Sequence, residues 1–142
     1  MSTEPLDLNL LIDKIRSNDT SVGSELYLTG ILRRHGCNVT DDRFVQFIEA
    51  LKVNTTFTVI NLSDNELGDD GAKYVADVMK VNKTFKSLDI GSNTIGNVGA
   101  SNIAEAVRVN TTLDKIRFCS NRIGAEGAAK IAEALKVNTT LT

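Results

Sequence analysis

Apolar and polar positions recur with one fixed period from Val53 to the end of the chain. The tetrapeptide Val-Asn-(Thr/Lys)-Thr marks this period, because its copies begin 28 residues apart, at Val53, Val81, Val109 and Val137. Between these marks, apolar residues stand at matching places in each copy, as Phe57, Ile60 and Leu62 do in the first. Self-similarity at a fixed period of this length predicts a solenoid in which each copy is one supersecondary unit.

Each period predicts one strand, one turn and one helix. In the first copy, Ile60 and Leu62 are apolar and flank a polar residue, which is the alternation of a strand with one buried face. In the middle copy, apolar residues at i, i+3, i+4 and i+7 form one face of a predicted helix, at Ala100, Ile103, Ala104 and Val107. The chain is therefore expected to alternate strands and helices, with strands that run parallel.

An asparagine follows each predicted strand where the chain bends, at Asn65, Asn93 and Asn121. A side-chain amide both donates and accepts hydrogen bonds, so it can satisfy backbone groups of its own turn and of a neighbouring turn. We therefore predict that the three asparagines stack as a structural ladder along the solenoid.

The pattern L-x-x-L-x-L-x-x-N-x-L with a 28-residue period resembles the ribonuclease-inhibitor-like class of leucine-rich repeats, from Val53 to Thr142. The resemblance implies an α/β leucine-rich-repeat solenoid, a right-handed βα superhelix with parallel strands on its concave face and helices on its convex face. The physical argument agrees, because one unit cannot bury its own apolar face and must stack on its neighbours.

The chain is expected to form a single domain, residues 1–142. We divide it into an N-terminal capping helix (1–21), an irregular first repeat (22–56), three regular repeats (57–84, 85–112 and 113–140) and the start of a truncated repeat (141–142). The capping helix is predicted from Pro5 to Ser17, where apolar residues again fall at i, i+3, i+4 and i+7. It is expected to cover the open end of the first repeat, as solenoid termini require.

The first repeat departs from the regular frame. Leu26-Tyr27-Leu28 supplies its predicted strand, and Asp41 starts its predicted helix. The segment Ile31–Asn38 lengthens the connection between them and contains two arginines beside His35. We interpret this segment as a solvated insertion, with a basic contact loop as the alternative.

The N-terminal part is also similar to the start of the repeat domain of tropomodulins. The resemblance rests on Leu11-Ile-Asp-Lys-Ile-Arg-Ser-Asn-Asp19, Leu26-x-Leu28-x-x-Ile31 and Phe47-x-x-Ala50-Leu51-Lys52-x-Asn54-Thr55. Tropomodulins cap the slow-growing end of actin filaments, so the resemblance implies actin as a partner. The tropomyosin-binding half and the C-terminal capping helix of that family have no counterpart in these residues. Actin binding is therefore the alternative to a more general protein-binding function.

Composition restricts the class of function. The chain is 42% hydrophobic and 24% charged with a net charge of −2, which is typical of a soluble protein. No basic surplus indicates nucleic-acid binding, and no apolar run is long enough to span a membrane. The N-terminus lacks the basic region and apolar run of a secretory signal, so we expect a cytoplasmic protein.

Two sets of residues resemble modification sites. Asparagines in Asn-x-Thr sequences match glycosylation acceptors, but they recur with the repeat and are better interpreted as helix-to-strand turns. Cys37 and Cys119 belong to different repeat levels, too far apart for a disulfide, so both are predicted to be free thiols. Cys37 is assigned a turn position like that of Asn65, and Cys119 the concave face.

The sequence predicts no active site, no metal and no cofactor. The single histidine, His35, has no partner at the spacing of a catalytic triad or a metal site. The pairs Asp41-Asp42 and Asp69-Asp70 open predicted helices, where carboxylates complement the helix dipole. A non-enzymatic protein is therefore expected. Some proteins of this repeat class stimulate a small GTPase, so a GTPase-activating helper is a second alternative.

The concave strand face is the predicted surface for a protein partner. Its rows are Val59, Ser87 and Lys115; Asn61, Asp89 and Arg117; and Ser63, Gly91 and Cys119. Core positions keep their character between repeats, whereas these positions vary, as recognition requires and as drift at solvated sites would also produce. Asp89 and Arg117 are level on adjacent strands, so an ion pair between them is expected.

The C-terminal end of the solenoid is predicted to be open. Leu141 holds the place of Phe57 and begins a strand that the sequence does not complete. An uncovered strand edge favours pairing with another chain. We therefore expect either an end-to-end homodimer or a place within a longer repeat array.

Overall fold

The computed structural model describes residues 5–142, so residues 1–4 of the predicted capping unit lie outside the described part. The elements are α1 (Leu8–Arg16), a 3₁₀ turn (Thr20–Val22), β1 (Glu25–Tyr27), α2 (Ile31–Arg34), α3 (Asp42–Val53), β2 (Val59–Asn61), α4 (Gly68–Val81), β3 (Ser87–Asp89), α5 (Asn97–Val109), β4 (Lys115–Arg117) and α6 (Ala125–Val137).

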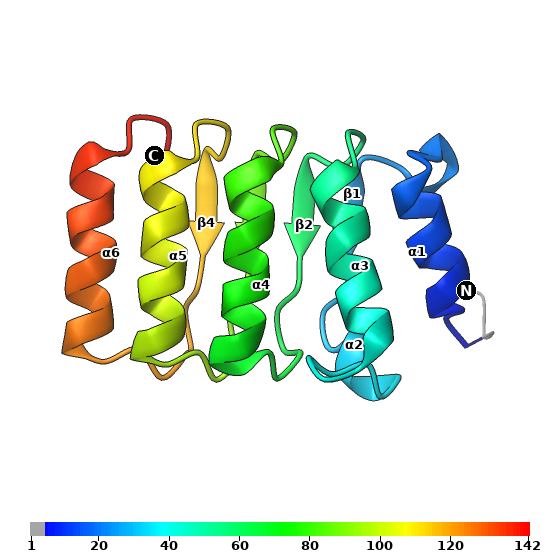
Figure 1. Ribbon diagram of the computed structural model, residues 1–142, viewed down its shortest axis with the longest axis horizontal. Helices are drawn as coiled ribbons and strands as arrows, with labels where there is room; N and C mark the ends of the chain where they lie inside the picture. The colour runs from blue at the N-terminus through cyan, green and yellow to red at the C-terminus, as the bar shows by residue number, and fades with distance from the viewer. Residues whose placement is uncertain (1–4) are drawn as a thin grey trace.

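The molecule has two layers, a parallel sheet and a row of helices. The strand order is β1-β2-β3-β4, and the register keeps equivalent residues level, as Ile60 with Leu88 and Leu88 with Ile116. Helices α3 to α6 lie side by side over one face of the sheet, and α1 continues their row beyond α3 (Figure 1). This arrangement confirms the predicted leucine-rich-repeat solenoid, with helices on the convex side and strands on the concave side.

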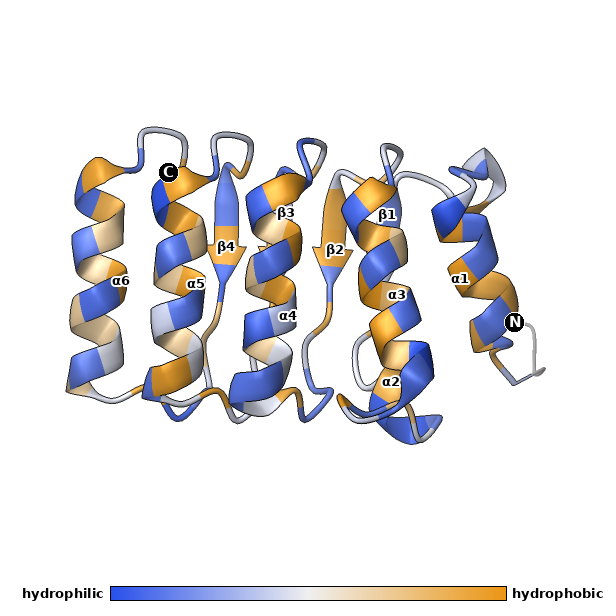
Figure 2. Ribbon diagram, viewed as in Figure 1, coloured by the Kyte–Doolittle hydropathy of each residue, from blue (hydrophilic) through white to orange (hydrophobic). Residues whose placement is uncertain are grey.

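The core lies between the two layers. In the first regular repeat, Ile60 and Leu62 are each 1% exposed and belong to the same buried cluster as Val75 and Met79 of the helix layer. Figure 2 shows hydrophobic and hydrophilic residues alternating along each helix, as an amphipathic helix requires. Equivalent residues of successive repeats extend the same core, so the units share one hydrophobic interior.

Small residues allow neighbouring helices α4, α5 and α6 to approach closely. A Cβ atom added to Gly99 would lie 2.9 Å from the Cβ of Ala72, and one added to Gly127 would lie 2.9 Å from the Cβ of Ala100. Both distances are shorter than a van der Waals contact. Glycine is therefore required at these positions because the preceding helix occupies the space of a side chain.

The Asp69 side chain forms hydrogen bonds to the next repeat, in addition to complementing the dipole of its own helix. Its Oδ1 accepts hydrogen bonds from the backbone N–H groups of Gly96 and Gly99, both at 2.8 Å. Asn97 does the same for Gly124 and Gly127 at 2.8 and 3.0 Å. Each side chain therefore satisfies the amino-terminal N–H groups of the next helix.

The asparagines of the Val-Asn-x-Thr marks form a row that the sequence analysis did not predict. The Asn82 amide donates to the carbonyls of Leu51 and Asn54 at 2.9 and 2.8 Å, while its Oδ1 accepts from the N–H groups of Thr84 and Phe85. Its counterparts Asn54, Asn110 and Asn138 make similar bonds. A glycosylation enzyme could not reach the Asn82 nitrogen, because the side chain is buried and already bonded.

Helix α1 lies within the predicted helical segment from Pro5 to Ser17. Asp7 caps it by accepting a 3.0 Å hydrogen bond from the N–H of Leu10. Ile12 and Ile15 are no more than 1% exposed and pack with α3 into the core. The helix therefore covers the apolar end of the first repeat.

The first repeat differs from its prediction in two ways. Its strand begins one residue earlier than expected, as Glu25–Tyr27, because the pairing register sets Glu25 level with Val59. The segment Ile31–Asn38 is partly helical and partly buried, since it contains α2 and the fully buried Leu32. It is therefore not the wholly solvated insertion that the sequence suggested.

The assignment of Cys37 to the Asn65-like turn position was wrong. Asn65 follows Leu62 by three residues, and the residue that follows the equivalent Leu28 by three is Ile31, whose N–H donates to the Leu28 carbonyl at 3.0 Å. Cys37 instead lies in the core at 1% exposure, where burial and the nearby charge of Asp41 raise the pKa of its thiol to about 11. Cys37 and the exposed Cys119 are both free thiols, as predicted.

Candidate functional site

The concave face carries the side chains that point away from the core on the four strands. Val59, Ser87 and Lys115 are level in one row, and Asn61, Asp89 and Arg117 in the next. The strand register therefore brings these predicted binding residues together on one surface. The side chains of these rows on β2 and β3 are half-buried, whereas Lys115 and Arg117 on β4 are exposed.

Glu25 and Tyr27 of β1 extend these rows, although neither was predicted as a binding residue from the sequence. Glu25 is level with Val59 and Tyr27 with Asn61. Tyr27 is 60% exposed, and its hydroxyl donates to Glu25 Oε2 at 3.1 Å, which raises the pKa of the phenol. The sequence could have indicated Tyr27, because a strand that buries Leu26 and Leu28 must turn the side chain between them outward.

A polar network fixes the side chains beside Tyr27. Asn61 Oδ1 accepts from the hydroxyls of Ser63 and Thr29 at 2.6 and 3.1 Å and from the N–H of Ser63 at 2.9 Å. The Ser63 hydroxyl also lies 3.2 Å from that of Thr29. These bonds hold one rotamer of each side chain and reduce the entropy that a partner would have to remove on binding.

The expected ion pair between Asp89 and Arg117 is not formed. Asp89 Oδ1 instead accepts a 2.9 Å hydrogen bond from the N–H of Gly91, which turns the carboxylate along its own strand. Neither Lys115 nor Arg117 forms an ion pair within residues 5–142. The C-terminal end of the concave face therefore presents two positive charges to an incoming partner.

The basic residues of Ile31–Asn38 are engaged within the fold. Arg33 forms ion pairs with Asp64 at 2.9 Å and with Glu66 at 3.8 Å. Arg34 donates to the backbone carbonyls of Gly30 and Thr29 at 3.0 and 3.1 Å. These contacts disfavour the basic contact loop, since both guanidinium groups already have partners.

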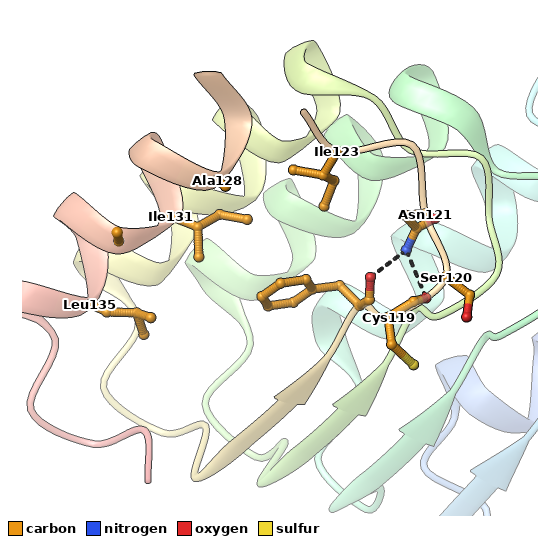
Figure 3. Close-up of a pocket in the computed structure, with 9 residues that line it drawn as sticks. Cys119, Ser120, Asn121, Ile123, Ala128, Ile131 and Leu135 are labelled. Atoms are coloured by element: carbon orange, nitrogen blue, oxygen red, sulfur yellow. Dashed lines mark hydrogen bonds between the residues drawn. The ribbon is translucent and has the colours of Figure 1, made fainter. Parts of the chain in front are cut away.

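Cys119 lies where the concave face meets the open end of the solenoid. Figure 3 shows it beside an open cavity that Phe118, Ile123, Ile131 and Leu135 line with apolar side chains. The volume of this cavity is about 450 Å³. The third repeat therefore leaves apolar surface uncovered within the described chain.

Behind the concave face, Asn65, Asn93 and Asn121 bond to one another's turns. The N–H of Asn65 donates to Asn93 Oδ1 at 2.8 Å, and the N–H of Asn93 donates to Asn121 Oδ1 at 2.9 Å. The Asn93 amide donates in turn to the carbonyls of Leu62 and Gly91. The turns that end the strands are thus tied together, which fixes the spacing of the concave rows.

Within residues 5–142, no cluster of three or more His, Cys, Asp or Glu side chains is arranged to hold a metal ion. None of the helices described here is long and apolar enough to cross a membrane.

Stacked strand–turn–helix units with parallel strands on one face and helices on the other define a leucine-rich-repeat domain. Residues 4–142 match the family model described as the TMOD/LMOD leucine-rich domain, so the chain belongs to this family. The predicted similarity to tropomodulins is thereby confirmed.

Two solved structures are similar to this chain. The structure described as leiomodin-1 actin-binding site 2 is 30% identical with a TM-score of 0.81, over 97% of this chain and 78% of that chain. The tropomodulin C-terminal domain of Caenorhabditis elegans is 15% identical with a TM-score of 0.69, over 94% and 93%, and shows the shared fold alone. A search of curated proteins gives no match.

Proposed function

We propose that this chain is a non-enzymatic protein-binding module whose partner is actin. The similarity to leiomodin-1 actin-binding site 2 carries the proposal, because it extends over 97% of the chain. Pointed-end capping, as in tropomodulins, is the finer form of the same hypothesis. An actin partner also implies a cytoplasmic protein.

We assign the contact to the concave strand face. Lys115 and Arg117 offer two exposed charges without an ion pair among the described residues, and Tyr27 offers an exposed aromatic ring at the opposite end. Arginine and tyrosine are enriched among the residues that dominate binding energy at protein interfaces. Asn61, Ser63, Ser87 and Asp89 lie between them, and Val59 and Cys119 complete the surface.

Charge reversal tests both parts of the proposal. Filament co-sedimentation and pointed-end assembly would be measured for the wild type, for Lys115→Glu/Arg117→Glu, and for Lys130→Glu/Lys136→Glu as a matched control on the exposed side of α6. We expect the wild type to bind actin, the first variant to bind about tenfold more weakly, and the control to bind as the wild type does.

The outcomes separate the partner from the surface. A wild type that neither sediments with actin nor alters its assembly would exclude actin as the partner. If the wild type binds and both variants bind equally well, actin remains the partner and the contact lies elsewhere. Circular dichroism of all three proteins checks that each variant retains its fold.

A further inference from the structure

The junction between α3 and α4 is wider than the other junctions of the helix layer. The first two regular repeats have Ala72 and Ala100 where the irregular first repeat has Phe44. The ring of Phe44 contacts Tyr74 edge-on, with ring centroids 5.7 Å apart. Helices α4, α5 and α6 pack more extensively on one another than α3 packs on α4. An aromatic pair therefore separates α3 from α4 where small residues join the other helices.

This separation leaves a groove of about 590 Å³. Its lining is Val39, Thr40, Val45, Asp70, Lys73, Tyr74 and Asp77. The groove thus combines apolar surface, from the exposed Val45 and the half-buried ring of Tyr74, with charges of both signs from Asp70, Lys73 and Asp77 on α4.

The pattern of ion pairs on the convex face is interrupted at the same junction. Lys80 pairs with Glu105 at 3.8 Å, and their counterparts one repeat later, Arg108 and Glu133, pair at 3.7 Å. The corresponding residues of the first junction are Lys52 and Asp77.

Lys52 bonds instead to Glu49 of its own helix at 2.7 Å. The shorter Asp77 forms no ion pair in the described chain, and neither does Asp70. Lys73 lies between them on α4 without an ion pair to either. Asp77 thus lacks the ion pair that its counterparts Glu105 and Glu133 form, and the carboxylates of Asp70 and Asp77 line the groove on either side of Lys73.

We propose that the groove between α3 and α4 binds a basic amphipathic helix of a partner protein. Asp70 and Asp77 are seven residues apart on α4, about two turns or ~10.5 Å along its axis. A helix lying along the groove with arginines two turns apart would meet both carboxylates. An apolar residue between those arginines would contact Val45 and Tyr74, in the helix-in-groove mode of recognition. This site lies on the convex side, so it is independent of the proposed actin contact.

The probe is an alanine-based helical peptide with two arginines two turns apart and a leucine between them. A matched peptide has glutamates in place of the arginines. Titration into the isotopically labelled chain, followed by amide chemical shifts, locates binding and gives its affinity. We expect the arginine peptide to shift amides of α3 and α4, the glutamate peptide to leave them unchanged, and added salt to weaken binding.

The peptide affinities of two double variants are compared. Asp70→Asn/Asp77→Asn removes both groove carboxylates, and we expect it to weaken peptide binding about tenfold. Glu105→Gln/Glu133→Gln removes two negative charges from the positions equivalent to Asp77 on α5 and α6, and we expect it to leave the affinity unchanged. Equal loss in both variants, shifts centred on the strands, or equal binding of the two peptides would overturn the proposal. Actin co-sedimentation of the same variants measures the proposed concave-face contact independently, and we expect both variants to bind actin as the wild type does.

Discussion

Individual asparagines connect one repeat to the next in this protein. Asn93 is fully buried, its amide donates to the carbonyls of Leu62 and Gly91, and its oxygen accepts from the N–H groups of Asn65 and Leu67. An alanine would leave these buried backbone groups without hydrogen-bond partners, in a place that water does not reach. Their satisfaction explains why a polar side chain occupies the interior.

Asn93→Ala is therefore expected to lower the free energy of unfolding by about 1–3 kcal/mol. Denaturant unfolding measures the change, and Asn9→Ala on the exposed side of α1 is the matched control, expected within about 0.5 kcal/mol of the wild type. A loss below about 0.5 kcal/mol for Asn93→Ala would count against a buried ladder.

The two cysteines are expected to differ in reactivity. The pKa of about 11 keeps the Cys37 thiol protonated at neutral pH, and its 1% exposure also blocks access of a reagent. Cys119 is exposed. Alkylation of the native protein at neutral pH should therefore label Cys119 alone, as peptide mass spectrometry would show, and unfolding should release Cys37. Rapid native labelling of Cys37 would contradict its burial.

At the scale of elements, the sequence predicted the regular repeats better than the first one. A strict period locates each strand and helix, because one unit's pattern repeats in the next. Segment Ile31–Asn38 has no second copy to compare, so neither its short helix nor the burial of Leu32 was predicted.

The hydrogen-bond and ion-pair partners of individual side chains were also not predictable from the sequence. Residues level on adjacent strands suggested a pair between Asp89 and Arg117, but a local N–H at Gly91 competes for the carboxylate. The hydrogen bonds from Asp69 to the next helix were missed for the same reason. The sequence shows how residues are spaced along the chain but not in which direction a side chain points.

The junction between α4 and α5 depends on Asp69. Asp69→Ala would leave the N–H groups of Gly96 and Gly99 without their acceptor, so we expect a loss of about 1–2 kcal/mol in the free energy of unfolding. Asp70→Ala, one residue away and exposed, is the control and should change it by less than about 0.5 kcal/mol. Hydrogen exchange at Gly96 and Gly99 should accelerate only in the first variant.

At the scale of the whole molecule, the two ends of the solenoid differ. Helix α1 buries Ile12 and Ile15 over the first repeat, whereas the last repeat leaves Leu135 46% exposed beside an open cavity. Within residues 5–142, strand β4 pairs with β3 alone. Just before β4, the Asp114 carbonyl accepts from the N–H and the hydroxyl of Thr142 at 3.0 and 3.2 Å. A polypeptide of these 142 residues therefore presents both an apolar surface and a strand edge.

We expect such a polypeptide to associate end to end as its concentration rises, because pairing of two β4 edges would satisfy their backbone groups and cover the cavity. In an antiparallel pair centred on Ile116, Lys115 of one copy would lie opposite Arg117 of the other, and like charges in that position are unfavourable. Salt should therefore strengthen the dimer by screening them. Lys115→Glu should have the same effect at low salt, since it places opposite charges across the pair.

Sedimentation velocity over a range of concentration and salt measures this association. A further repeat added after Thr142 is the control, and it should abolish the dimer by occupying the same edge. A chain that stays monomeric at high concentration, with slow amide exchange from Asp114 to Cys119, would show that the edge is already protected. Dimers that weaken with salt would exclude the antiparallel pairing, because its cations repel one another.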